Sequence, residues 1–442
     1  MDFEVGIIGL GYVGLTLAAA LAKSGVKVLG IERNEEIVTK VNSGKAHFTE
    51  VGLAPIIEDQ IKNGNLIAKK KFDATDCCKY FIITVGTPLG SDGKPRIDMI
   101  KTAISEVINQ MSEASTIIVR STVEVGTTRK LVENELIKTN KKYYLAMCPE
   151  RTLEGNAIKE LNLLPQIIGS DSFKASESAA KLFRNITKSI IYVDTYEAAE
   201  IIKLVDNAYR DIQFAFANEV ARACDSVGVN ALEVINSGKQ NYPRTNVALP
   251  GLVGGPCLEK DPHIFHQSLK KYGIDLEITK AARFVNERQP SEVISKLIEK
   301  YFKNKLKDRL KVSLLGMAFK GKPLTDDLRG SMATVVYKEI RESLPSAQIG
   351  VYDPVVSKEN LKNHYPNCQI FKDIKDAAED TDLLLITNNN DFFSHQNLDD
   401  IINSLSPEGI VFDFWNNFSS DPVAVNNKKY LSLGNFKVAN NE

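Results

Sequence analysis

The sequence predicts an α/β protein with two Rossmann-like, doubly wound domains joined by a long central helix and a helical middle segment. Three observations support this. Short apolar runs alternate with helical segments over the first 195 residues, a stretch of roughly 30 residues without Gly or Pro follows, and a second alternation begins near Arg309. Strands alternating with helices form parallel sheets covered on both faces, and right-handed crossovers wind them in two directions.

The first alternation begins with a strand at Phe3–Gly9, an Ala-rich helix at Leu10–Ser24 and a second strand at Val26–Glu32. Two further helices are predicted over Ile97–Met111 and Thr127–Lys138. The remaining buried strands of this half are predicted at Tyr80–Val85, Thr116–Arg120, Tyr143–Ala146, Gln166–Ile168 and Ser189–Val193. We assign residues 1–195 to an N-terminal NAD-binding domain.

The middle segment, residues 196–305, opens with one helix from Tyr196 to about Val227, whose apolar residues keep helical spacing. A helix of about 30 residues far exceeds the usual 11–12. It carries more apolar residues than one small sheet covers, so we expect a two-fold homodimer that buries it. A loop rich in Gly and Pro follows at Tyr242–Pro262, and helices continue to about Asn304.

Residues 306–442 form the predicted C-terminal Rossmann-like domain. Its helix is predicted at Ser331–Ser343. Its strands are predicted at Val312–Leu315, Gln348–Tyr352, Leu383–Thr387 and Ile410–Phe414.

Composition narrows the class of protein. The 442 residues are 43% hydrophobic and 25% charged, which is typical of globular chains. With 55 basic and 56 acidic residues, the chain has no general attraction to nucleic acid or anionic membranes. No apolar run reaches the roughly 20 residues of a membrane helix, and the N-terminus lacks a basic leader. The cysteines, at positions 77, 78, 148, 224, 257 and 368, show neither a disulfide nor a zinc pattern. We therefore expect a cytoplasmic protein without a metal.

A dinucleotide-binding pattern follows the first predicted strand. Gly9-Leu10-Gly11-Tyr12-Val13-Gly14 fits G-x-G-x-x-G, and the Ala-rich helix comes next. Gly9 allows a tight turn, Gly11 lets the backbone of Tyr12 and Val13 approach a pyrophosphate at the helix N-terminus, and Gly14 permits close packing. A Gly-rich turn in a fold without a cofactor is the alternative, but all the contextual conditions of the motif are met.

The second strand ends at Glu32, about 20 residues beyond the glycines, where a carboxylate can accept from the ribose hydroxyls. It would repel a 2′-phosphate, so the sequence predicts NAD rather than NADP, although the neighbouring Arg33 could receive one. Thr87 and Thr122 follow two other predicted strands. Because ligands gather at the carboxyl ends of parallel strands, these are candidate cofactor contacts or, equally, plain helix caps.

The segment Gly254-Gly255-Pro256-Cys257-Leu258-Glu259-Lys260-Asp261-Pro262 is the most informative. Two glycines allow close backbone approach or positive φ. A thiol near a helix start can have a lowered pKa. A lone cysteine is more often a small buried hydrophobe than a nucleophile; the glycines before it and Lys-Asp after it favour catalysis.

Seven motifs occur together and in order. They are Gly-x-Gly-Tyr-Val-Gly, Ser-Thr-Val-x-Val-Gly-Thr-Thr at 121–128, Pro-Glu-Arg at 149–151, Lys203 with Asn207, Gly-Gly-x-Cys-x-x-Lys-Asp at 254–261, Ala-Phe-Lys at 318–320 and Tyr-Asp-Pro at 352–354. In this combination the chain resembles the UDP-glucose/GDP-mannose dehydrogenase family over essentially its full length.

This resemblance implies oxidation of the C6 alcohol of a nucleotide sugar to a carboxylate with two NAD per turnover. An aldehyde donates hydride poorly, so a thiolate first converts it to a thiohemiacetal, and water later hydrolyses the resulting thioester. Such a scheme needs a nucleophilic cysteine, a cation for the oxyanions and a base for water.

The resemblance also implies the residue roles. Cys257 is the nucleophile, Lys203 and Asn207 share a helix face and hold the C6 oxygen, and Asp261 orients or activates a water. Glu154 matches a glutamate that serves thioester hydrolysis and contacts substrate. The remaining implied contacts are Lys260 and Arg329 to the cofactor, Lys320 and Gly254 to the substrate, and Arg244 to the substrate across a dimer interface.

Arg151 is the main indication of the sugar. UDP-glucose enzymes of this family usually carry an aromatic residue after Pro-Glu, whereas the branch acting on UDP-N-acetylmannosamine or UDP-N-acetylglucosamine carries Arg. The chain therefore resembles a UDP-N-acetylhexosamine 6-dehydrogenase that supplies surface polysaccharide precursors. Part of that branch lacks Glu154 and the Lys-Asp pair, so UDP-glucose remains an alternative.

Two readings from other classes stay open. A non-catalytic NAD-binding sensor would share the fingerprint, but Cys257, Lys203, Asn207 and Asp261 argue against it. A two-electron β-hydroxyacid dehydrogenase would share the layout, would need no cysteine and would consume one NAD.

Overall fold

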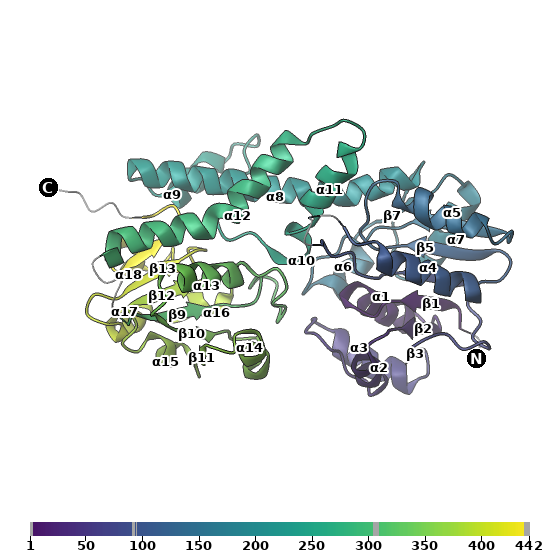
Figure 1. Cartoon of the computed structure of the whole chain (residues 1–442), viewed down its shortest axis with the longest axis horizontal. Helices are drawn as coiled ribbons and strands as arrows, with labels where there is room; N and C mark the ends of the chain where they lie inside the picture. The colour runs from purple at the N-terminus through teal and green to yellow at the C-terminus, as the bar shows by residue number, and fades with distance from the viewer. Residues whose placement is uncertain (1–2, 91–92, 94, 304–308, 437–442) are drawn as a thin grey trace. The chain divides into compact units, whose positions relative to one another are not determined.

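A computed structural model describes residues 3–90, 93, 95–303 and 309–436. The chain forms two compact units, which we call unit 1 (Met1–Asn207 and Lys260–Asp275) and unit 2 (Ala208–Glu259 and Leu276–Glu442). Each contains one Rossmann-like sheet, so the predicted fold class is confirmed (Figure 1). The three-part division stays a prediction: its boundary at 305/306 lies outside the described residues, and the middle segment is shared between the units.

Unit 1 is built on an eight-stranded sheet in the order β3-β2-β1-β4-β5-β6-β7-β8. β1 lies between β2 and β4, which makes the carboxyl end of β1 the topological switch point. The strands are β1 (Val5–Ile8), β2 (Val28–Ile31), β3 (Leu66–Lys69), β4 (Tyr80–Ile83), β5 (Ser115–Val119), β6 (Tyr143–Met147), β7 (Gln166–Gly169) and β8 (Ile190–Val193).

The sheet departs from the predicted parallel order at one pairing, since β7 runs antiparallel to β6. A parallel neighbour requires a crossover that carries the chain back along the sheet. The connection here contains only the seven-residue helix α6 (Ala157–Leu163), and the strand after it runs back instead.

The helices of unit 1 cover both faces of its sheet. Ile7 and Ile82 point into one apolar core, and their neighbours Ile8 and Ile83 point into the other, as the two-residue period of a strand requires. Besides α6, the helices are α1 (Tyr12–Lys23), α2 (Glu35–Asn42), α3 (Leu53–Lys62), α4 (Asp98–Gln110), a π-helical turn (Thr128–Glu133), α5 (Asn134–Ile137), α7 (Phe173–Phe183) and α11 (Asp261–Lys270).

Unit 2 repeats the pattern with a six-stranded, all-parallel sheet in the order β11-β10-β9-β12-β13-β14. Its switch point lies where β9 has β10 on one side and β12 on the other. The strands are β9 (Lys311–Leu315), β10 (Gln348–Tyr352), β11 (Gln369–Ile370), β12 (Leu383–Ile386), β13 (Ile410–Asp413) and β14 (Tyr430–Ser432).

Helices again cover both faces of the second sheet. Leu314 and Leu385 point into the larger core, and Leu315 and Ile386 into the smaller one. The helices are α9 (Ala231–Lys239), α10 (Gly255–Leu258), α12 (Glu277–Leu297), a second π-helical turn (Ile298–Phe302), α13 (Met332–Ser343), α14 (Lys358–His364), α15 (Ile374–Ala378), α16 (Asp391–Ser394), α17 (Leu398–Ser404) and α18 (Pro422–Asn426).

The predicted long helix is confirmed as α8 (Tyr196–Val227), which begins in unit 1 and ends in unit 2. Ala199 packs into a core of unit 1, and Ala221 and Cys224 pack into a core of unit 2. Within the described part of the chain, no helix combines the length and apolar character needed to cross a membrane.

Candidate active site

The glycine loop after β1 has the geometry that a dinucleotide requires. Gly9 has a φ of 94°, and a Cβ at Gly14 would lie 1.8 Å from the Gly9 carbonyl oxygen, so both positions need glycine. A Cβ at Gly11 would meet no described atom within 4 Å. This open space lies at the N-cap of α1, which has no side-chain cap, and α1 begins with Tyr12 and Val13. Room and N–H donors are what a pyrophosphate needs, so these residues fit NAD.

Glu32 lies beside this loop. One carboxylate oxygen accepts from Leu10 N–H at 2.9 Å and the other from Asn34 N–H at 3.0 Å. These bonds fix the carboxylate at the carboxyl end of β2, where ribose hydroxyls would be recognised. The neighbouring Arg33 is exposed and pairs with Glu106 at 3.4 Å.

Thr87 and Thr122 meet at the carboxyl ends of β4 and β5. The Thr87 hydroxyl donates to the Thr122 carbonyl at 2.5 Å, and the Ser121 hydroxyl donates to the Val85 carbonyl at 2.7 Å. The two loops are therefore held together at the sheet edge where the cofactor fingerprint also lies.

A buried cluster that the sequence did not indicate connects the glycine loop to the segment containing Glu154. The Tyr12 hydroxyl donates to Glu50, and the Glu50 carboxylate accepts from Gly155 N–H at 2.6 Å and Ala157 N–H at 2.8 Å. Burial, reinforced by the bond to Glu50, raises the pKa of Tyr12 well above its usual range. Glu154 itself is half-buried.

Three predicted residues of unit 1 are joined by hydrogen bonds at the start of α11. The Asn207 amide donates to one carboxylate oxygen of Asp261 at 2.6 Å, and the Lys260 ammonium donates to the other at 2.8 Å. Asp261 is fully buried, and Lys203 and Asn207 are nearly so. Lys203 lies one turn before Asn207 on α8, so both belong to one face of the helix.

Glu150 is a second buried carboxylate of unit 1 that the sequence did not single out. Its side chain accepts from Arg120 Nε at 2.9 Å and from the N–H groups of Arg151 and Thr152, each at 2.7 Å. Burial alone would raise the pKa of Glu150, but the charge of Arg120, then the bond from Thr152 N–H, and then the charge of Lys203 hold it below its usual range. The charge of Lys203 therefore acts on this carboxylate.

Arg151 extends from the same loop to α8, where its Nε–H donates to Asp206 at 2.7 Å. Asp206 immediately precedes Asn207. This ion pair ties the residue predicted to select the sugar to the helix that carries Lys203 and Asn207. Arg120 directly follows the buried strand β5, and a charged residue at the end of such an apolar run was the available signal for this cluster.

The cysteine loop lies in unit 2. Gly255 has a φ of 90° and donates from its N–H to the Gly330 carbonyl at 2.7 Å, while a Cβ at Gly254 would lie 2.4 Å from the same oxygen. Both predicted uses of glycine are thus present, and the close approach is to this chain's own backbone. Cys257 lies in α10, a single turn, and is exposed.

Unit 2 also holds the remaining predicted contacts. Lys320 lies over the Phe319 ring at 5.2 Å. Arg329 is exposed, and its guanidinium donates to Asp327 at 2.5 and 2.8 Å. The neighbouring Ala318 N–H donates to Asp353 at 2.9 Å, which joins the Ala-Phe-Lys and Tyr-Asp-Pro motifs.

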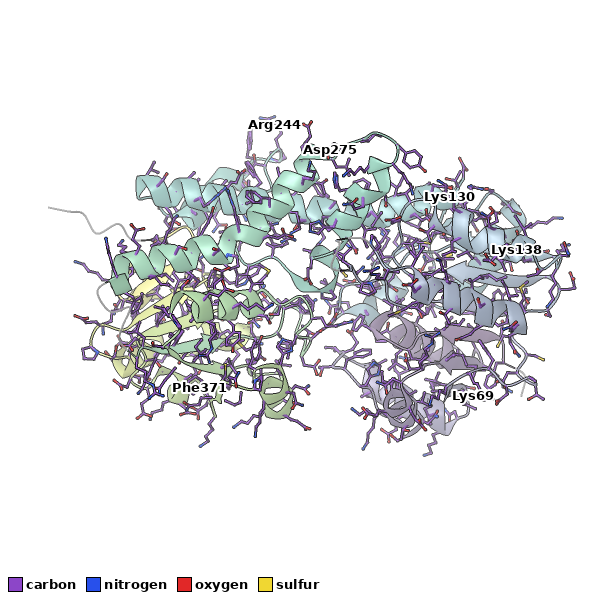
Figure 2. The ribbon with its side chains drawn as sticks, viewed as in Figure 1. Lys69, Lys130, Lys138, Arg244, Asp275 and Phe371 are labelled. Carbon is purple, nitrogen blue, oxygen red and sulfur yellow. The ribbon has the colours of Figure 1, made fainter. Side chains whose placement is uncertain are left out.

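Arg244 follows α9 in a loop of unit 2. Its guanidinium stacks on Tyr242 at 4.6 Å. Figure 2 shows its side chain pointing outward from the ribbon. An exposed arginine of this kind could reach a neighbouring molecule.

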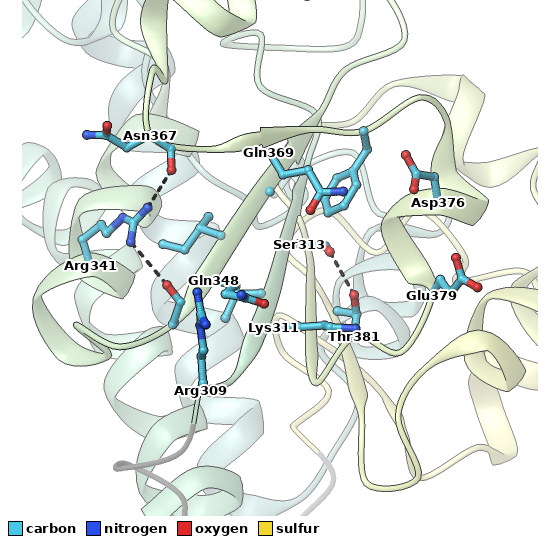
Figure 3. Close-up of a pocket in the computed structure, with 15 residues that line it drawn as sticks. Arg309, Lys311, Ser313, Arg341, Gln348, Asn367, Gln369, Asp376, Glu379 and Thr381 are labelled. Carbon is cyan, nitrogen blue, oxygen red and sulfur yellow. Dashed lines mark hydrogen bonds between the residues drawn. The ribbon is translucent and has the colours of Figure 1, made fainter.

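A separate cavity of about 490 Å³ lies in unit 2 (Figure 3). It is lined by the first residues of β9 and β10, Lys311 and Gln348, so it faces the sheet edge opposite the switch point. Arg341 donates to the backbone carbonyl of Asn367 at 3.1 Å, and the Ser313 and Thr381 hydroxyls bond each other at 3.1 Å. These polar groups bond within the protein, and none of the predicted site residues lines this cavity.

Comparison with protein families gives three consecutive matches. Residues 3–187 match the NAD binding domain of the UDP-glucose/GDP-mannose dehydrogenase family, residues 197–288 its central domain, and residues 313–420 its UDP binding domain.

Individual relatives point to the same group. A protein of Pyrococcus horikoshii named UDP-N-acetyl-D-mannosamine dehydrogenase is 35% identical over 359 residues, which are 80% of this chain and 84% of that protein. A protein of the same name from Methanococcus maripaludis is 32% identical over 93% of this chain and 92% of its own length. The solved structure of the UDP-D-ManNAc dehydrogenase from P. horikoshii superposes with a TM-score of 0.87 at 30% identity, covering 99% of this chain and 100% of that one.

Proposed function

Since the chain belongs to the UDP-glucose/GDP-mannose dehydrogenase family of NAD-dependent enzymes, we propose that it oxidises UDP-N-acetyl-D-mannosamine at C6 to the uronic acid. The observation that carries the choice of sugar is the name shared by relatives that are 30–35% identical over most of the chain. Arg151 supports it, because a guanidinium can donate to the carbonyl of a 2-acetamido group. The product would serve as a precursor of surface polysaccharide.

The cofactor would be held by the glycine loop, with its pyrophosphate at the N-terminus of α1 and its ribose hydroxyls on Glu32. When bound there, NAD would supply the hydride acceptor for each of the two oxidations. The overall balance is R–CH₂OH + 2 NAD⁺ + H₂O → R–COO⁻ + 2 NADH + 3 H⁺.

Lys203 and Asn207 would act on the alcohol stage. As the C6 hydroxyl loses its proton and then a hydride, negative charge develops on its oxygen, and a buried ammonium stabilises that charge strongly. The Asn207 amide carries a second donor toward the same oxygen, while its bond to Asp261 fixes its orientation. The product of this stage is the aldehyde.

Cys257 would act on the aldehyde stage. Its thiolate forms an S–C6 bond, and the carbonyl oxygen takes a proton, giving a thiohemiacetal. Loss of a hydride from C6 to the second NAD⁺, together with loss of the hydroxyl proton to solvent, gives a thioester. Water then attacks C6, the S–C6 bond breaks, and the thiol is restored. Asp261, or Glu154 on its half-buried segment, would accept the proton of that water.

The test is a panel of UDP-sugars with NAD, followed by NADH absorbance and by mass spectrometry of the product. We expect UDP-N-acetyl-D-mannosamine to give the highest kcat/KM and two NADH per uronate. Equal kcat/KM for UDP-glucose would overturn the choice of sugar. One NADH per product would replace the scheme by a two-electron dehydrogenase, and no turnover of any UDP-sugar would favour the sensor.

We also propose that the enzyme is a homodimer formed through α8. Tyr209 and Phe216 on this helix are 60% and 55% exposed, and Phe284 on α12 is 60% exposed. Large apolar side chains gathered on neighbouring helices are typical of protein interfaces. The exposed Arg244 fits the same proposal, in which it would contact the substrate of the partner.

A further inference from the structure

We infer that Arg283 of α12 is a positioning residue that sets the location of the Cys257 thiol. The inference rests on the proposed nucleophilic role of Cys257. The contribution of Arg283 is confined to the aldehyde stage, because the alcohol stage forms no bond to sulfur.

The Arg283 guanidinium forms hydrogen bonds on both sides of the cysteine in its loop. Nη1–H donates to the Leu258 carbonyl at 2.9 Å, and Nη2–H donates to the Val253 carbonyl at 2.9 Å. These two carbonyls bracket the four residues from Gly254 to Cys257. One planar side chain therefore fixes both ends of the segment that carries the thiol.

The same guanidinium is itself fixed in place. Nη1–H also donates to Asp211 of α8 at 2.7 Å, and Asp211 accepts from Asn286 at 2.9 Å. Arg283 is 3% exposed, and Asp211 and Asn286 are fully buried. A buried ion pair with several hydrogen bonds keeps a single geometry, because any other arrangement would leave a charge unsolvated.

A further amide extends this network to the start of the loop. The Asn218 side chain accepts from Gly251 N–H at 3.0 Å, donates to the Gly251 carbonyl at 3.1 Å and donates to Asn286 at 3.0 Å. Two helices of unit 2, α8 and α12, thus hold the loop at three backbone positions: Gly251, Val253 and Leu258.

A purely structural role would not require this arrangement. The charge of Arg283 is already balanced by Asp211 on the neighbouring helix. This ion pair would hold the two helices together without any contact with the loop. Yet two of its contacts are with loop carbonyls. Leu258 is the last residue of the single turn α10, whose terminal carbonyls have no partner within so short a helix.

The test measures the rate of each oxidation separately for Arg283→Lys and for the wild-type enzyme. The UDP-sugar alcohol is supplied for the first stage and the UDP-sugar aldehyde for the second. Lysine keeps the charge beside Asp211, but its ammonium is one point and cannot reach both carbonyls. We expect the aldehyde stage to slow on the order of 100-fold, as misplacement of a reacting group by about 1 Å does. The alcohol stage should change less than about threefold, with release of free aldehyde.

Arg222→Lys is the matched control. Arg222 also connects α8 to α12, through Glu292 at 3.3 Å, and its second ion pair is with Glu219 on α8 itself. It should leave the ratio of the two stages unchanged. Asp211→Asn tests the ion pair that holds Arg283 in place, and it should likewise slow the aldehyde stage selectively.

The results distinguish failure of the positioning role of Arg283 from failure of the proposed function. If Arg283→Lys slows both stages equally, or keeps the aldehyde stage within about threefold of wild type, Arg283 does not position the thiol. If the wild-type enzyme itself yields one NADH per product, the proposed function fails, and the role of Arg283 fails with it.

Discussion

At the scale of single residues, Cys257 separates a four-electron from a two-electron enzyme. Cys257→Ala should abolish uronate formation while leaving slow aldehyde production, because only the second oxidation needs a covalent adduct. The loss can reach several powers of ten. Cys257→Ser should add the aldehyde and form an ester that hydrolyses slowly, visible as a mass increase on the protein. Near-normal uronate formation by Cys257→Ala would contradict the mechanism.

The cysteines should also differ in reactivity. Burial raises the pKa of the Cys78 and Cys148 thiols to about 12, so only about one in ten thousand is ionised at pH 8. Cys257 and Cys77 are exposed. Iodoacetamide at pH 8 should therefore label Cys257 and Cys77 and spare Cys78 and Cys148 until the protein unfolds. Peptide mass spectrometry measures this, and early labelling of Cys148 would count against the described packing.

Glu32 should decide the cofactor. A 2′-phosphate beside its fixed carboxylate would place like charges together, so kcat/KM for NADP should lie on the order of 100-fold below that for NAD. Glu32→Gln keeps a hydrogen-bond acceptor and removes the charge. It should lower the ratio of kcat/KM for NAD to kcat/KM for NADP roughly tenfold. Comparable kcat/KM for the two cofactors in the wild-type enzyme would contradict this role of Glu32.

At the scale of elements, the loop between β6 and α6 should control the sugar. Arg151 uses its Nε–H on Asp206, and we assign its other N–H donors to the acetamido carbonyl. Arg151→Phe should lower the kcat/KM ratio of UDP-N-acetyl-D-mannosamine to UDP-glucose by about 10–100-fold, because a site built for that carbonyl loses its donor. Asp206→Asn, which keeps an acceptor for Arg151, is the control and should change the ratio far less. An unchanged ratio in Arg151→Phe would exclude this role.

The helix α8 shows how one element serves several purposes. Its part in unit 1 carries Lys203, Asp206 and Asn207, and its part in unit 2 carries Asp211 and Asn218, which hold the cysteine loop. Within each unit the helix places its side chains at fixed spacings, about 1.5 Å of axis per residue. Residues for both stages of the reaction are therefore attached to the same element.

At the scale of the whole molecule, we expect a dimer of twice the chain mass in sedimentation at micromolar concentration. Tyr209→Glu combined with Phe216→Glu should give a monomer, because two charges would be buried in an apolar contact. Phe173→Glu is the matched control: Phe173 is 77% exposed on α7, which takes no part in the proposed interface. A monomeric wild type, or a double variant that stays dimeric, would refute this interface.

The sequence by itself determined the parts that depend on local periodicity and on backbone constraints. The limits of α8, the strands β1, β2 and β4, and the glycine positions in both loops were predicted. Apolar spacing follows the helix or strand period, and a positive φ restricts a position to glycine whatever surrounds it. The family motifs added residue roles, which stay predictions.

The tertiary structure alone decided the short strands and the buried polar networks. β3, β11 and β14 were not predicted: each is an edge strand of its sheet, and a single partner strand supplies the hydrogen bonds that define it. The pairs Tyr12–Glu50, Arg120–Glu150 and Arg283–Asp211 join residues 38, 30 and 72 positions apart. A charged residue that is buried looks the same in sequence as one that is exposed, because its burial depends on which distant segments pack around it.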